Sequence, residues 1–117
     1  MVIRRRSWLG GIGLRKVYYT EEFRSQLTQL KKYLKTEFDK DVAHKVESDI
    51  KAVIDELKIM PEIGISIGER FGIDTHYLCF YVRHHYICYD YNDENVYILG
   101  MIHEKQKAIT LLKRLLK

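Results

Sequence analysis

Two histidines stand where predicted strands end, and each has a basic residue close by. His84 follows Arg83 in the segment VRHHY, and His103 precedes Glu104 and Lys105 in the segment MIHEKQ. An imidazole with a pKa near 6.5 can give or take a proton at neutral pH, and arginine or lysine can hold a phosphate. Metal-independent RNA cleavage needs these functions, because the 2′-OH loses a proton, the phosphate charge is stabilised and the leaving 5′-oxygen gains a proton.

For such a reaction we expect His103 to act as the general acid and His84 as the base or as the partner of His103. Arg83 and Lys105 would hold the scissile phosphate. The competing interpretation is that these residues are solvated surface, which is usual for charged side chains at turns and strand ends. Two histidines without a third ligand at metal-binding spacing predict no metal site, and we expect no cofactor.

Tyrosines line the strands that lead to these histidines. We expect Tyr77, Tyr81 and Tyr86 to bind RNA, because aromatic rings stack on the bases of single-stranded nucleic acid. Arg70, between two predicted strands, would add a phosphate contact. The alternative is that tyrosines occur here because they are good strand formers.

Two short turns set the expected register of the strands. Two-residue loops at Arg83-His84 and Asp93-Glu94 would join the flanking strands as hairpins. The face that packs under helices would then hold Leu78, Phe80, Val82, Ile87, Tyr89, Val96 and Ile98. The other face would hold Tyr77, Cys79, Tyr81, Tyr86, Cys88, Asp90, Tyr97, Leu99 and Met101. At its edge, His84 would lie opposite His103, although a one-residue slip would exchange the faces.

Helical and strand patterns divide the chain into the elements that position these residues. Apolar stripes predict one helix over about 21–37, with Thr20 as its N-cap, and a second that begins at Asp39 or Asp41 and ends before Pro61. Short segments rich in β-branched and aromatic residues predict strands at 15–19, 63–67, 74–82, 85–91 and 96–102, and a last apolar stripe predicts a helix at 104–116. The expected fold class is α+β, with an antiparallel four- to five-stranded sheet packed on the N-terminal helical hairpin and a C-terminal helix.

The length and composition of the chain fit a single domain, which we expect to be cytoplasmic. A chain of 117 residues can bury a single core, and no apolar run approaches the roughly 20 residues of a membrane-spanning helix. We expect residues 1–14, which include three arginines and three glycines, to form a basic arm and residues 15–117 to form the domain.

Cys79 and Cys88 face each other in the expected register. A disulfide is one option, but buried thiols fit the reducing cytosol better. The net charge of +4 only mildly favours an anionic partner.

In their order, these segments resemble the RelE/ParE superfamily of bacterial type II toxins over residues 15–107. KVYYTEEFRSQL resembles the opening strand and first helix, and the helical hairpin closes on a Leu-x-x-x-Pro-x-x-Gly-type ending at Leu57, Pro61 and Gly64. HHYICYDYNDENVYILGMIHEKQ resembles the tyrosine-containing strand, the acidic turn and the last strand, which ends in histidine. The resemblance implies a toxin that arrests growth and is held inactive by a cognate antitoxin protein.

Two activities occur in that superfamily. RelE-type members cut mRNA on the ribosome, whereas ParE-type members inhibit DNA gyrase by binding it and are not nucleases. We favour a ribosome-dependent mRNA endoribonuclease, because His103 matches a histidine that serves in cleavage in some members and Lys105 lies near the family's cationic residue. Strand positions that are basic in RelE-type members are Tyr77, Cys79 and Tyr86 here, and the long hairpin resembles ParE. The gyrase inhibitor is therefore the alternative, and an inactive relative that binds only an antitoxin is a third possibility.

Overall fold

The computed structural model describes residues 14–106 and Thr110, which include three α-helices, one short 3-10 helix and five strands. In chain order they are β1 (Lys16–Tyr19), α1 (Glu21–Glu37), α2 (Lys40–Ile59), the short 3-10 helix η1 (Pro61–Ile63), β2 (Ile65–Ser66), α3 (Ile67–Phe71), β3 (Leu78–Val82), β4 (His85–Tyr91) and β5 (Asn95–His103). The predicted α+β class is confirmed. The predicted arm lies outside the described residues except for Leu14, and so does most of the predicted C-terminal helix.

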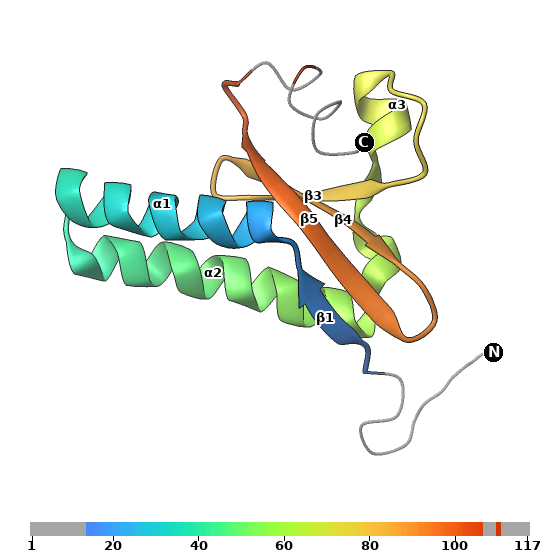
Figure 1. The fold of residues 1–117 in the computed structure, drawn as a ribbon, viewed down its shortest axis with the longest axis horizontal. Helices are drawn as coiled ribbons and strands as arrows, with labels where there is room; N and C mark the ends of the chain where they lie inside the picture. The colour runs from blue at the N-terminus through green and yellow to red at the C-terminus, as the bar shows by residue number, and fades with distance from the viewer. Residues whose placement is uncertain (1–13, 107–109, 111–117) are drawn as a thin grey trace.

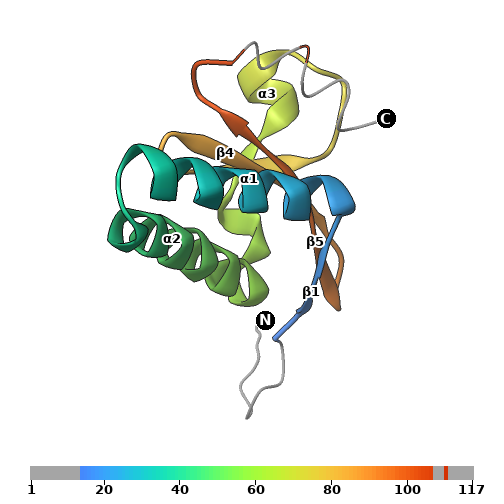
Figure 2. The same ribbon diagram turned by 60° about the vertical axis from the view of Figure 1, so that its left-hand side comes forward.

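Side-chain caps start both long helices. Thr20 Oγ1 accepts a hydrogen bond from the Phe23 amide at 3.1 Å, and Asp39 Oδ1 accepts one from the Val42 amide at 2.9 Å. Of the two residues expected at the start of this helix, Asp39 and Asp41, it is therefore Asp39 that caps α2. Figures 1 and 2 show α1 and α2 side by side as an antiparallel hairpin on one face of the sheet.

The sheet has the strand order β1-β5-β4-β3-β2 and is mostly antiparallel (Figure 1). The exception is β1, which pairs in parallel with β5. The chain leaves β1 directly into α1, and the Thr20 amide at that junction still bonds to the Ile98 carbonyl at 3.1 Å. The sheet is thus mixed, and β1 is its one departure from the antiparallel arrangement expected.

The hairpin of β3 and β4 has the predicted two-residue loop. Arg83 and His84 both have positive φ, at 50° and 68°, as a type I′ turn requires. Cys79 pairs with Cys88, and both are free and fully buried. The register of this hairpin is confirmed.

A β-bulge changes the register of the next hairpin. Between Cys88 and Tyr89 the pairing of β4 with β5 shifts by one residue. As a result His85, and not His84, lies opposite His103, so the predicted pairing of His84 with His103 is wrong. The bulge also turns Met101 to the helix-covered face, where it joins the main core, whereas it was expected on the other face.

Each face of the sheet carries its own apolar core. The main core joins the helical hairpin to the face that holds Ile87, Tyr89 and Ile98, as expected. A second core covers the opposite face; its buried members are Ile67, Cys79, Cys88 and Ile102. Phe71, Tyr77 and Tyr86 pack against it. The predicted open face is therefore partly closed by α3.

Two helical segments shorten one predicted strand to two residues, because η1 ends at Ile63 and α3 begins at Ile67. The alternating isoleucines predicted a strand over 63–67, but only Ile65–Ser66 pair with β3. Ser66 then caps a helix by accepting from the Glu69 amide at 3.2 Å, and Gly72, with φ of 70°, ends it. Ile67, the first residue of this helix, is buried in the second core.

The side chain of Gln26 stands in for a strand along part of β5. β1 pairs with β5 only up to Ile98, and beyond it the Gln26 amide donates to the Met101 carbonyl at 2.8 Å and accepts from the Met101 amide at 2.6 Å. Met101 is 4% exposed, so water cannot readily replace these bonds. Gln26 thereby pairs the backbone of β5 at Met101, beyond the end of β1, where the edge of the sheet would otherwise be unpaired.

We expect Gln26→Ala to lower the free energy of unfolding by about 1–3 kcal/mol, because it leaves a buried N–H and C=O without partners. Urea denaturation measures this loss. Gln29→Ala is the control, since Gln29 is exposed and bonds only to Ser25 Oγ at 3.5 Å. Equal midpoints for both variants would contradict the role given to Gln26.

Candidate functional site

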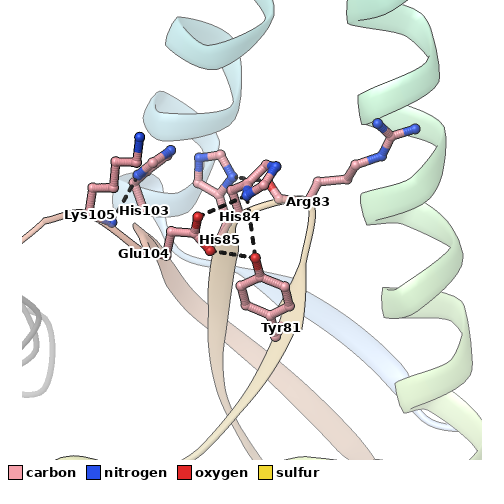
Figure 3. A network of polar contacts seen from close by, with 7 residues as sticks. All are labelled: Tyr81, Arg83, His84, His85, His103, Glu104 and Lys105. Atoms are coloured by element: carbon pink, nitrogen blue, oxygen red, sulfur yellow. Dashed lines mark hydrogen bonds and ion pairs between the residues drawn. The ribbon is translucent and has the colours of Figure 1, made fainter.

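A cluster of polar side chains lies where the β3–β4 turn meets the end of β5. Figure 3 shows Tyr81, His84, His103 and Glu104 converging there. The rings of His84 and His103 are 6.5 Å apart between centroids, and those of His85 and His103 are 5.0 Å apart. The Glu104 amide donates to the His84 carbonyl at 2.8 Å, which ties the turn after β5 to the hairpin turn.

Glu104 is the centre of this cluster. One carboxylate oxygen accepts a hydrogen bond from the Tyr81 hydroxyl, and the other accepts one from His84 Nδ1 at 2.9 Å. The bonds from Tyr81 and then His84 lower the pKa of Glu104, while the bond to Glu104 raises the pKa of Tyr81. Glu104 had no expected role, because only the folded turn after β5 brings it against the β3–β4 hairpin.

The tautomer of His103 follows from a backbone contact. The Lys105 amide donates to His103 Nδ1 at 3.1 Å (Figure 3). In the neutral imidazole the hydrogen must then be on Nε2, so His103 can donate from Nε2 but has no lone pair left for a base. Held in this way, the neutral ring is a hydrogen-bond donor at Nε2. To act as the general acid expected, His103 would also have to be protonated on Nδ1 and to lose the bond from Lys105.

The predicted cations lie apart from one another. Arg83 points away from the histidines toward α2, where its Nε donates to Asp49 Oδ2 at 2.6 Å (Figure 3). Arg70 lies on α3, and its Nη2 donates to the Tyr86 hydroxyl at 3.3 Å. Lys105 lies beside His103 (Figure 3). One expected phosphate contact thus lies at the cluster, and two are engaged elsewhere.

The predicted tyrosines divide in the same way. Tyr81 belongs to the cluster, and the ring of Tyr86 packs edge-on against it at 5.3 Å. Tyr86 also packs edge-on against Phe71 of α3 at 5.4 Å. Tyr77 is half-buried at the second core. The structure therefore brings together Tyr81, Tyr86 and the two histidines, and places Tyr77 and Arg70 on the side of α3.

His85 is a member of the cluster that the sequence analysis did not select. Its Nδ1 donates to the Arg83 carbonyl at 2.8 Å, and its ring is half-buried. Burial, which penalises the charged form, lowers the pKa of His85 below its usual 6.5. Its position in the strand directly opposite His103 depends on the bulge, which the sequence did not reveal.

The lowered pKa of His85 predicts a loss of stability in mild acid. At a pH below its usual 6.5, the unfolded chain binds a proton at this site that the folded chain resists. The contribution of neutral His85 to the free energy of unfolding is therefore fully present above that pH. It is lost as the pH falls toward the pKa of His85 in the folded state. We expect the urea midpoint to fall between about pH 7.5 and about pH 5, and His85→Gln to flatten this fall.

His44→Gln is the control for that experiment, since His44 is exposed on α2. It should keep the wild-type dependence on pH. The range ends above the usual 4.5 of glutamate, so the lowered pKa of Glu104 does not add to the change. The same slope in wild type and His85→Gln would contradict the assignment to His85.

The described part of the chain has neither a metal-binding cluster nor a membrane-spanning helix. In residues 14–106 and Thr110, no group of three or more His, Cys, Asp or Glu side chains is arranged to hold a metal ion. Within the same residues, no helix has the length and apolarity that crossing a membrane requires.

Comparisons with known proteins agree with the fold. No curated protein matches the sequence. A solved structure from a chromosomal ParDE TA system of P. aeruginosa superposes with a TM-score of 0.63, covering 78% of this chain and 97% of that one at 11% identity, so the likeness is one of fold. The sequence profile of the family described as "ParE toxin of type II toxin-antitoxin system, parDE" matches residues 17–108. Since this match spans most of the sequence, the chain belongs to the ParE toxin family, within the RelE/ParE superfamily of type II toxins.

Proposed function

We propose that this toxin arrests growth by binding DNA gyrase, as ParE-type toxins do, and that it does not cut mRNA. The observation that carries the proposal is the separation of the cations. Arg83 is paired with Asp49 on α2, and Arg70 is bonded to Tyr86 from α3. A nuclease has to gather positive charge around one phosphate, whereas a toxin that binds a protein does not.

The second core supports the same proposal. RNA bound on the sheet would need an uncovered aromatic face, but α3 covers the middle of that face. Cys79 and Cys88 are fully buried beneath it, and Tyr77 and Tyr86 pack at its margin. Of the three tyrosines expected to bind RNA, Tyr81 at the cluster around Glu104 is the most exposed, at 44%. Membership of a toxin–antitoxin family adds a cognate antitoxin as the protein that restrains the toxin.

A second candidate is mRNA cleavage on the ribosome, the activity that the sequence analysis favoured. The network around Glu104 is the observation in its favour. Its carboxylate, which the lowered pKa keeps ionised, would take the proton of a 2′-OH, and the 2′-oxygen would attack the phosphorus. His103 would protonate the leaving 5′-oxygen after taking up a proton on Nδ1 in place of the bond from Lys105. This assigns Glu104 the role of base that was expected of His84.

Induced expression separates the two candidates. Gyrase inhibition should produce filamentation and a DNA-damage response, and the purified toxin should block supercoiling by gyrase. Glu104→Gln and His103→Ala should both keep this growth arrest. The nuclease candidate expects rapid mRNA loss, and these variants should then cleave mRNA ~10²–10⁴-fold more slowly.

Glu94→Gln, in the exposed turn before β5, is the matched control and should behave as wild type in both assays. Urea midpoints of all three variants confirm that each is folded. Loss of mRNA cleavage and of growth arrest together in Glu104→Gln and His103→Ala would contradict the gyrase proposal. Wild-type expression without any growth effect would contradict both candidates and indicate a relative that only binds an antitoxin.

A further inference from the structure

A groove of about 510 Å³ lies between the tip of the α1–α2 hairpin and the turn of the β3–β4 hairpin. We call it the tip groove. Its wall on the side of the two helices is mostly apolar and consists of Leu30, Tyr33, Leu34, Phe38, Val42 and Val46. Its opposite rim comes from the ends of the strands and consists of Arg83, His84, His85 and His103.

The helical hairpin extends past the edge of the sheet, which leaves part of the apolar wall uncovered (Figure 1). Leu34 is 8% exposed, but Phe38, one turn further along, is 63% exposed. Val42, at the start of α2, is 36% exposed. An aromatic and a β-branched side chain next to each other at the surface form an apolar patch of the kind that marks an interaction site.

The rim supplies hydrogen-bond donors. Arg83 uses Nε for Asp49, and the other two nitrogens of its guanidinium carry the remaining donors. His103 has its neutral-form hydrogen on Nε2, because Nδ1 accepts from Lys105. Two carboxylates already contact the rim and are engaged there. Asp49 accepts from Arg83, and Glu104 accepts from Tyr81 and His84. The rim therefore suits a carboxylate better than a cation.

We propose that the tip groove binds an amphipathic helix of a partner protein, with large apolar side chains on one face and carboxylates along the edge of that face. A helix fits because the wall is itself made of helices, against which a third helix can pack its ridges. The apolar face would cover Phe38 and Val42, and the carboxylates would meet Arg83 and His103. The inference does not depend on whether the toxin acts on gyrase or on mRNA.

Two synthetic helices provide the test. Both have roughly 16 residues, a length at which isolated helices begin to be stable, and the same stripe of leucine and phenylalanine. One carries glutamates along the edge of the stripe and the other carries lysines. We expect the full chain to bind the glutamate peptide at least ~10-fold more tightly, which equals about 1.4 kcal/mol, in a calorimetric titration, and less tightly as salt is added.

Variants of the chain locate the binding. Phe38→Ser should weaken the glutamate peptide roughly tenfold, while Phe38→Leu should keep most of the affinity. Ile59→Ser is its control, since Ile59 is 60% exposed at the opposite end of α2. Arg83→Gln should weaken binding and reduce its salt dependence. Lys58→Gln is the charge control, because Lys58 also pairs with a carboxylate, Asp55, at 3.2 Å.

Equal affinity for the two peptides would overturn the charge assignment. Equal losses in Phe38→Ser and Ile59→Ser would overturn the location, and so would the absence of measurable binding of the glutamate peptide to the wild-type chain. Urea midpoints establish that each variant is folded. No gyrase or ribosome is present in this assay, so its result is independent of the growth-arrest experiments.

Discussion

Replacing Gly64 with alanine is expected to lower the free energy of unfolding by about 3 kcal/mol, a large fraction of the roughly 5–15 kcal/mol by which folded domains are stable. The backbone of Gly64, with φ of −73° and ψ of 172°, is one that any residue adopts, so the effect comes from space alone. A Cβ there would collide with the Tyr89 hydroxyl, lie 2.9 Å from Tyr89 Cε1 and lie 2.8 Å from the Cys79 carbonyl oxygen. Neither a buried ring nor a strand carbonyl can move away easily.

The collision arises because the backbone of Pro61 and Gly64 binds the hydroxyl of Tyr89; we call this binding site the Tyr89 socket. This fully buried tyrosine donates its hydroxyl hydrogen to the Pro61 carbonyl and accepts from the Gly64 amide at 3.0 Å. Leu57 is also fully buried in the main core. The ending Leu57, Pro61 and Gly64, which the sequence analysis compared with the toxin family, therefore has a structural reason: it anchors the end of α2 to the middle of β4.

Urea denaturation of three variants tests this explanation. Tyr89→Phe alone should cost about 1–3 kcal/mol, because the carbonyl of the buried Pro61 and the amide of the half-buried Gly64 lose their partner. Combined with Gly64→Ala it should cost less than the sum, since the nearest colliding atom is gone. Gly72→Ala, at φ of 70° in open space, should cost only about 1 kcal/mol. If the losses in free energy of unfolding from Gly64→Ala and Tyr89→Phe were strictly additive, the collision with Tyr89 would not be the cause of the Gly64 effect.

Local chemistry made much of the fold predictable from the sequence. The caps at Thr20 and Asp39, the apolar stripes of α1 and α2, and the two-residue loop at Arg83-His84 each depend on neighbouring residues only. Residue type and spacing are therefore enough to identify them. The same reasoning placed Ile87, Tyr89 and Ile98 on the face that the helices cover.

Features that depend on distant contacts could not be predicted in this way. The bulge at Cys88 and Tyr89 moves the pairing by one residue, and with it the partner of His103. The alternation of Ile63, Ile65 and Ile67 fits a strand, but Ser66 caps a helix that the second core holds in place. Likewise the sequence indicated which residues carry charge, but not that Arg83 turns to Asp49.

The second core predicts the chemical behaviour of the two cysteines. Burial raises the pKa of Cys79 to about 11 and that of Cys88 to about 12, so neither thiol should react while α3 is docked. α3 has only five residues, and Ile67, which is fully buried, is its buried contact with this core. Opening of α3 should thus be a local event that needs less free energy than global unfolding.

We expect Ile67→Ala to raise the rate of thiol labelling by an exchangeable disulfide reagent roughly 100-fold, because losing about 3 kcal/mol of docking free energy favours the open state by that factor. Ile54→Ala is the matched control: Ile54 is 4% exposed in the main core, so its loss should lower the urea midpoint similarly. Labelling of Ile54→Ala should still require global unfolding and stay slow at low urea. Equal labelling rates would mean that α3 does not open alone, and the sheet face would then be uncovered only when the whole domain unfolds.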